Sequence, residues 1–146
     1  MKKIRANRLA IIVLVVTLAF VFCGCGSSKT TKERAYVVTF SGYQFYYLFD
    51  TDAHTVKWFY YDTGSKTIYS YAEGEYDGEI TGDKTLKVSF TAEDKSKWIE
   101  IFKFDKNPQY VGITMIGGTL PESNEVRGIQ TDESKVIDIL TMNGYK

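Results

Sequence analysis

The sequence has few of the residues that most often carry chemistry or cross-link a fold. Among its 146 residues it contains two cysteines, Cys23 and Cys25, and one histidine, His54. After residue 25 the chain therefore offers no disulfide, no thiol nucleophile and no conventional zinc site. Its longest apolar run also falls short of the roughly 20 residues that a membrane-spanning helix needs.

The chain also lacks an excess of charge of one sign, because 18 basic side chains balance 18 acidic ones. Four of the basic residues precede residue 25, which leaves 14 basic and 18 acidic side chains in the rest of the chain. A mildly acidic body lacks the basic surface on which nucleic acids bind, so no nucleic-acid partner is expected. Aromatic residues, in contrast, make up 15% of the sequence, which excludes a disordered protein or a coiled coil and favours one folded domain.

The N-terminal segment is typical of an export signal. Residues 1–8 are basic, residues 9–22 are apolar, and Gly24 stands directly before Cys25. This segment resembles a bacterial lipoprotein precursor, in which the signal peptide is removed and the cysteine that follows receives a diacylglycerol. Cys25 is preferred to Cys23 because a small residue precedes it, whereas the bulky Phe22 precedes Cys23.

The resemblance implies a signal peptide over residues 1–24, lipidation of Cys25, and a protein anchored in the cell membrane on its extracytoplasmic face. An uncleaved N-terminal membrane anchor is the alternative. Residues 25–34 are polar and rich in small side chains, which indicates a flexible tether to the domain that follows.

Short strands separated by turns are expected over most of the remaining chain. Turn-forming residues recur about every 8–13 positions, which favours an all-β barrel or sandwich over a fold with alternating strands and helices. Short connections make consecutive strands antiparallel neighbours. Gly74 and Gly78 leave open whether that stretch is one bent strand or two. The clearest strand patterns are residues 36–40, 43–49, 55–61, 67–71, 86–90, 98–104 and 110–116, with a short one at 126–129.

An amphipathic helix is predicted near the C-terminus. Val136, Ile137, Ile139 and Leu140 form an apolar stripe at helical spacing after an N-cap at Thr131 or Asp132. Gly144 suits the residue after the helix. Such a helix needs a sheet to cover.

A meander of about eight strands with a C-terminal helix resembles the lipocalin-like (calycin) barrels. We therefore expect an all-β domain over residues 35–146, an antiparallel meander of about seven or eight strands closed into a small lipocalin-like barrel, with a helix over residues 132–143. An eight-stranded barrel is just wide enough to fill itself or to hold one small ligand. Whether this one has a cavity, and whether it closes as a barrel or packs as a sandwich, stays open at the level of sequence.

Aromatic rings crowd the first half of the domain and occur on both faces of several strands. Phe45 adjoins Tyr46, and neighbours on a strand point to opposite faces. One face must be core, whereas the other presents rings outward or lines a cavity. Tyrosine and tryptophan join an apolar ring to a polar tip, which suits ligand binding. The alternative is a core filled by large rings, with cross-strand tyrosine pairs outside. The candidate ligand-binding residues are Tyr46, Trp58, Tyr60, Tyr69 and Tyr71.

An acidic run follows the aromatic strands. Its alternate spacing places several carboxylates on one face of a strand, where they form either a solvated surface or the face that docks a partner. The candidate residues for this face are Glu73, Glu75, Asp77 and Glu79. A hydrolase that uses two of these carboxylates is a more remote possibility.

Other polar motifs lack the context that chemistry requires. His54 follows Asp50 and Asp52 in a turn, and no strand–turn–helix nucleophile motif accompanies it. The same aspartates begin like a calcium loop, but positions six and twelve are Thr55 and Tyr61. No catalytic residue, metal site or cofactor is therefore expected.

These observations predict a non-catalytic, membrane-anchored extracytoplasmic lipoprotein that binds a small apolar molecule, a glycan or a peptide. The alternative is a protein-interaction or enzyme-inhibitor module that uses an outward tyrosine face and the acidic strand.

Overall fold

A computed structural model describes residues 33–146, except residues 81, 108 and 119–122. The predicted signal peptide, most of the predicted tether and Cys25 lie outside the described residues. The first strand begins at Glu33, inside the segment that the sequence assigns to the tether.

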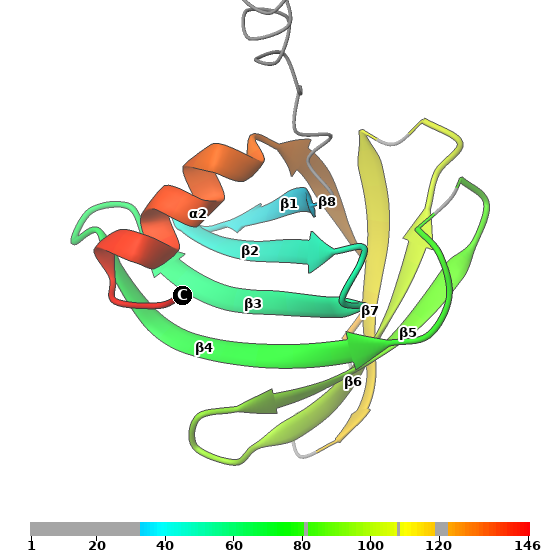
Figure 1. Cartoon of the computed structure of the whole chain (residues 1–146), viewed down its shortest axis with the longest axis horizontal. Coiled ribbons are helices and arrows are strands. Elements are labelled where there is room, and N and C mark those ends of the chain that lie inside the picture. Colours follow the sequence, from blue (N-terminus) through cyan, green and yellow to red (C-terminus); the bar gives the residue numbers. More distant parts are fainter. Residues whose placement is uncertain (1–32, 81, 108, 119–122) are drawn as a thin grey trace, which may run out of the picture. The chain divides into compact units, whose positions relative to one another are not determined.

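Eight antiparallel strands form a closed barrel in simple chain order, and the last strand pairs with the first (Figure 1). This architecture confirms the predicted all-β meander closed into a lipocalin-like barrel with a C-terminal helix. The strands are β1 (Glu33–Phe40), β2 (Tyr43–Asp50), β3 (Thr55–Asp62), β4 (Thr67–Tyr76), β5 (Thr85–Ala92), β6 (Lys97–Phe104), β7 (Tyr110–Gly118) and β8 (Val126–Thr131).

The short turns follow directly from residues that accept unusual backbone geometry or bond their own backbone. Between β1 and β2, Ser41 and Gly42 both have positive φ, as a two-residue hairpin requires. After β2, the Asp50 carboxylate accepts hydrogen bonds from the backbone N–H groups of Asp52 and Ala53, both at 2.9 Å. Asp50 therefore stabilises the hairpin turn that joins β2 to β3.

Strand β4 is continuous through Gly74, which answers the question that the sequence leaves open. A Cβ atom at Gly74 would lie 2.6 Å from Val88 Cγ1 and 2.9 Å from the Phe90 ring. The glycine thus lets two large side chains of β5 pack against the backbone of β4 inside the barrel.

Large side chains fill one end of the barrel interior. The ring of Phe49 lies at the centre of this inner core and makes edge contacts with Tyr36, Phe102 and Phe104 at centroid distances of 5.2–6.0 Å. The sequence pattern on β5, β6 and β7 alternates accordingly, with one apolar face turned inward.

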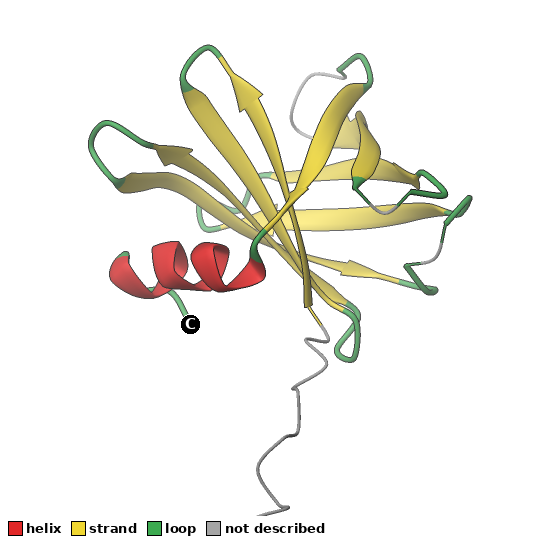
Figure 2. Ribbon diagram, turned by 90° about the horizontal axis from the view of Figure 1, so that it is seen from above, coloured by secondary structure: helices red, strands yellow, loops and turns green. Residues whose placement is uncertain are grey.

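A second apolar core lies outside the barrel, under the C-terminal helix α2 (Glu133–Met142). Figure 2 shows this helix lying along the outer side of the strands. Asp132 is its N-cap, with its side chain accepting from the Ser134 N–H at 2.9 Å, and Gly144 follows the helix with φ of 85°. The helix buries Val136, Ile139 and Leu140. Strands β1–β4 are therefore covered on both faces, which explains their rings on both faces.

In the part of the chain that the structure describes, no helix combines the length and the apolar character needed to cross a membrane.

Candidate functional site

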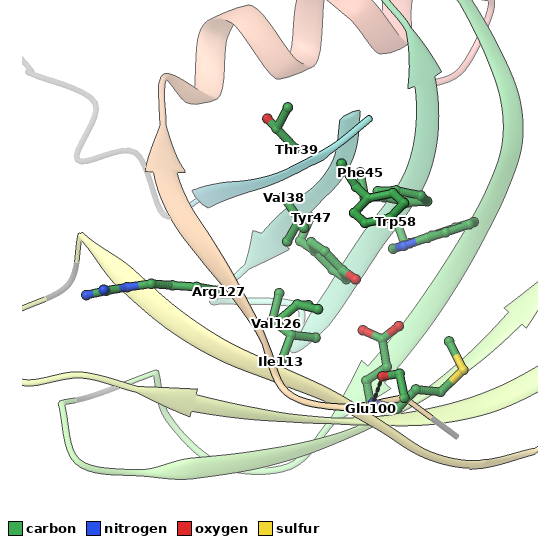
Figure 3. A pocket seen from close by; sticks show the side chains of 12 residues that line it. Val38, Thr39, Phe45, Tyr47, Trp58, Glu100, Ile113, Val126 and Arg127 are labelled. Atoms are coloured by element: carbon green, nitrogen blue, oxygen red, sulfur yellow. Dashed lines mark hydrogen bonds between the residues drawn. The ribbon is translucent and has the colours of Figure 1, made fainter. Parts of the chain in front are cut away.

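A pocket of about 410 Å³ occupies the end of the barrel that the inner core leaves unfilled (Figure 3). Side chains of β1, β2, β3, β6, β7 and β8 form its wall, and most of them are apolar. Four of them, Val38, Phe45, Trp58 and Met115, are the partly buried residues that pack against the inner core. The complete lining is Val38, Thr39, Phe40, Phe45, Tyr47, Trp58, Glu100, Ile113, Met115, Ser123, Val126 and Arg127.

Aromatic rings form one side of this pocket. Phe45 on β2 stacks on Trp58 of β3 at a centroid distance of 6.2 Å, and on Tyr60 at 5.1 Å. Trp58 in turn meets the edge of Trp98, at 5.1 Å. The ring row continues to the barrel rim, where Tyr43 lies 5.2 Å from Tyr60. A flat apolar ligand would find a preformed stacking surface here.

One carboxylate interrupts this apolar interior. Glu100 on β6 is only 3% exposed, although it lines the pocket. Its Oε1 accepts a hydrogen bond from the indole N–H of Trp98 at 2.9 Å. Its Oε2 has no hydrogen-bond partner among the described residues. In Figure 3 the carboxylate projects into the barrel toward the hydroxyl end of Tyr47.

Burial decides the charge of this group. Loss of hydration raises the pKa of Glu100 to about 7, even though the Trp98 indole and the Tyr47 hydroxyl both act to lower it. Burial, and then the nearby Glu100 carboxylate, hold the pKa of Tyr47 well above its usual range. Near neutral pH the pocket therefore holds a protonated tyrosine beside a carboxyl group that readily gains or loses its proton.

A bulge next to Glu100 shapes the same wall. Along the β6–β7 pair, Ile99 lies opposite Gly117 whereas Glu100 lies opposite Met115, so Ile116 is the extra residue. Beyond the bulge, Gly118 has φ of 128°, and a Cβ atom there would lie 2.2 Å from the Trp98 Cα atom. The glycine lets the two backbones approach closely at the residue whose indole holds Glu100.

The basic residue at the pocket mouth does not neutralise Glu100. The Arg127 guanidinium lies 3.8 Å from the centroid of the Tyr110 ring, and its Nη2 lies 3.9 Å from Asp105 Oδ2. Figure 3 shows its side chain directed away from Glu100.

The structure separates the five aromatic candidates. Trp58 lines the pocket, and Tyr60 and the 60% exposed Tyr69 continue the ring row toward the rim. Tyr46 and Tyr71 instead belong to the outer core under α2. Tyr71 also donates a hydrogen bond to the Glu73 carboxylate, at 2.6 Å.

The acidic candidates lie on the exposed surface. Glu73 and Glu75 share the outer face of β4, while Asp77 and Glu79 follow the end of that strand. His54 is exposed and its ring stacks on Tyr76 at 5.5 Å. Within the described ranges, no group of three or more histidine, cysteine, aspartate or glutamate side chains is placed to hold a metal ion.

Sequence reasoning did not single out Glu100. Its only signal is its position on β6, where alternate residues Trp98, Glu100, Phe102 and Phe104 share a face and Glu100 is the one polar member.

Comparisons with known proteins find no match to this chain among family models, curated proteins or solved structures. The pocket is therefore the feature of the molecule from which a function can be inferred.

Proposed function

We propose that the protein is a membrane-anchored extracytoplasmic lipoprotein that binds a small molecule in the open end of its barrel and catalyses no reaction. The observation that carries this proposal is the pocket, which is lined by apolar and aromatic side chains from six strands. Of the ligand classes that the sequence leaves open, a small molecule with an apolar body fits this lining best.

The dimensions of the barrel support the proposal. An eight-stranded barrel is wide enough for one small ligand. The pocket volume of about 410 Å³ falls within the usual range of small-molecule sites. The exposed aromatic rim, which includes the 70% exposed Phe40 and the 42% exposed Tyr43, lies at the hairpin beside the pocket and offers an apolar way in.

Ligand binding is testable because both tryptophans of the chain lie at this site. We expect native mass spectrometry of the protein from its own host to show a bound small molecule, and that molecule to change the tryptophan fluorescence. Trp58→Ala should weaken its affinity at least about tenfold, equivalent to about 1.4 kcal/mol. His54→Ala, which removes an exposed ring at the β2–β3 turn, outside the pocket lining and the ring row, is the control and should bind normally. A bare protein mass would contradict the proposal and favour the protein-interaction alternative, for which the acidic residues of β4 offer a surface.

The membrane anchor has its own test. We expect Cys25→Ser to move the protein from the membrane fraction to the soluble fraction or to leave an unprocessed precursor, because the thiol that accepts the diacylglycerol is gone. Cys23→Ser should remain membrane-bound and carry the lipid mass. The reverse result would assign the lipid to Cys23, whereas a full-length wild-type protein without the lipid mass would support an uncleaved anchor.

A further inference from the structure

The pocket contains one buried polar atom, Glu100 Oε2, that lacks a well-formed hydrogen bond among the described residues, although the Tyr47 hydroxyl points toward the same carboxylate. Oε1 of this carboxylate is instead held by the Trp98 indole. A buried acceptor without a donor destabilises the protein by about 1–3 kcal/mol, and more when it is charged. A buried group of this kind calls for an explanation, and a donor supplied by a bound ligand is one that fits its place in the pocket wall.

We propose that the pocket binds a small amine, with a primary ammonium group that donates to Glu100 Oε2 and an apolar, preferably aromatic, body that stacks on Phe45 and Trp58. This inference rests on the proposed function, since it names the ligand class of the same pocket. The proposal distinguishes amines from other ligands with an apolar body, because fatty acids and neutral lipids have no ammonium group to donate to Glu100 Oε2.

The charges around the pocket favour a cation over an anion. Glu100 is the one acidic side chain in the lining, and Arg127 is the one basic side chain there, already engaged by Tyr110 and Asp105. A ligand carboxylate would meet Glu100 without a cation to separate the two, and like charges repel strongly where water is excluded. An ammonium group instead gains a charge-assisted hydrogen bond.

The surrounding rings favour a cation as well. The faces of tryptophan and tyrosine rings attract ammonium groups, most strongly when both partners are desolvated. Trp58 and Tyr47 both line the pocket with Glu100, and Trp98 meets Trp58 edge to face. A primary ammonium has three N–H donors, of which Oε2 of Glu100 takes one and the Tyr47 hydroxyl oxygen can accept another.

Glu100 Oε2 is buried, so the pocket wall has to give way slightly before a ligand head group reaches it, and one flexible side chain lies beside Glu100. Met115 lies directly opposite Glu100 across the β6–β7 pair, and it lines the pocket. Methionine is unbranched and changes rotamer readily, so its movement opens Oε2 to the head of a ligand whose body lies toward the rim.

Three probes that share one aromatic body distinguish the head groups: phenethylamine, phenethyl alcohol and phenylacetate. At about pH 8, calorimetry should show the amine binding at least about tenfold more tightly than the alcohol, and phenylacetate binding most weakly. Glu100→Gln should lower the affinity for the amine at least about tenfold and leave that for the alcohol within about threefold. Glu73→Gln, which alters an exposed carboxylate on β4, should change neither.

Acidification supplies a second measurement on the unaltered protein. Lowering the pH to about 5.5 protonates Glu100, so amine affinity should fall while alcohol affinity holds. Among the described residues, the titratable side chain that faces Glu100 is Tyr47 from β2, whereas Arg127 of β8 lines the pocket mouth and is directed away from the carboxylate. Strands β5 and β7 present the apolar side chains of Val88, Ile113 and Met115. Tyr47 keeps its proton throughout this range, because burial raises its pKa well above the usual value.

Equal affinities for the amine and the alcohol, or an amine affinity that Glu100→Gln leaves unchanged, would overturn the amine assignment while the pocket remains a ligand site. Failure of all three probes to bind would also overturn it. A small molecule in the native mass spectrum would then keep the proposed function, and a bare protein mass would remove both.

Discussion

Glu100→Gln is expected to remove a decline in the stability of the protein between about pH 4.5 and pH 7. In the folded state the pKa of Glu100 is about 7, against an ordinary value of 4.5. Within this window the native state holds a proton that the unfolded chain has released, so the free energy of unfolding falls as pH rises. The stabilisation is fully present below about pH 4.5 and is lost as the pH passes through 7. Each pKa unit corresponds to about 1.4 kcal/mol, so the whole decline amounts to roughly 3 kcal/mol.

Urea unfolding at a series of pH values measures this effect. Glutamine keeps an oxygen that can accept from the Trp98 indole and carries no charge, so the variant should be markedly more stable than the wild type above about pH 7. Glu73→Gln, on the exposed face of β4, should show the wild-type decline. Parallel pH profiles for the wild type and Glu100→Gln would contradict the assignment of the decline to this carboxyl group.

Phe49→Ala is expected to lower the free energy of unfolding by about 3–5 kcal/mol, the usual range for loss of a fully buried phenylalanine. Phe49 is 0% exposed and contacts four other rings, all at centroid distances of 5.2–6.0 Å. The inner core at this end of the barrel has no open neighbour into which it could collapse, so the substitution leaves a cavity. The four rings that contact Phe49 belong to Tyr36, Tyr76, Phe102 and Phe104.

Phe40→Ala removes the same side chain at an exposed position and is the control for Phe49→Ala. Phe40 is 70% exposed at the pocket mouth, and its replacement should alter stability by no more than about 0.5 kcal/mol. Thermal or urea unfolding of the two variants compares them directly. Similar losses for both would mean that Phe49 is not central to the core, contrary to its contacts.

The order of the strands was predictable because the turns between them contain turn-forming residues that can be recognised from the local sequence. Ser41-Gly42 and the Asp50 turn carry their geometry within three or four residues, and short turns leave consecutive strands little choice but to pair. The length of β4 was harder to predict, since Gly74 reads as an interruption in sequence. Its reason is the packing of Val88 and Phe90 from another strand, which no local pattern contains.

The two faces of β1–β4 show a similar limit. The sequence displays an apolar stripe on residues 136–140 and rings on both faces of β2 and β3. It does not show that the helix bearing this stripe packs over the outer rings of the strands. Tyr46 and Tyr71 therefore looked equivalent to Trp58 as ligand-binding residues. Tertiary packing under α2 separates them.

The burial of Glu100 is the feature of the candidate site that the sequence alone could not predict. Alternation on β6 places it on the same face as Trp98 and Phe102, yet β6 also carries Ile99 and Ile101 on the other face. Which face turns into the barrel depends on the pairing with β5 and β7, and only that pairing shows the carboxylate to be buried.

The position of α2 after the last barrel strand also affects the solubility of the protein. The barrel closes only when β8 pairs with β1, and the outer rings of β2 and β3 are covered only when α2 docks after it. A chain cut short before residue 133 would leave Tyr46, Phe59 and Tyr61 uncovered on one continuous aromatic strip, the type of surface that drives aggregation and attracts chaperones and proteases. Docking of α2 is thus a condition of solubility as well as of stability, because the helix covers the apolar strip that the closed barrel leaves on its outer face.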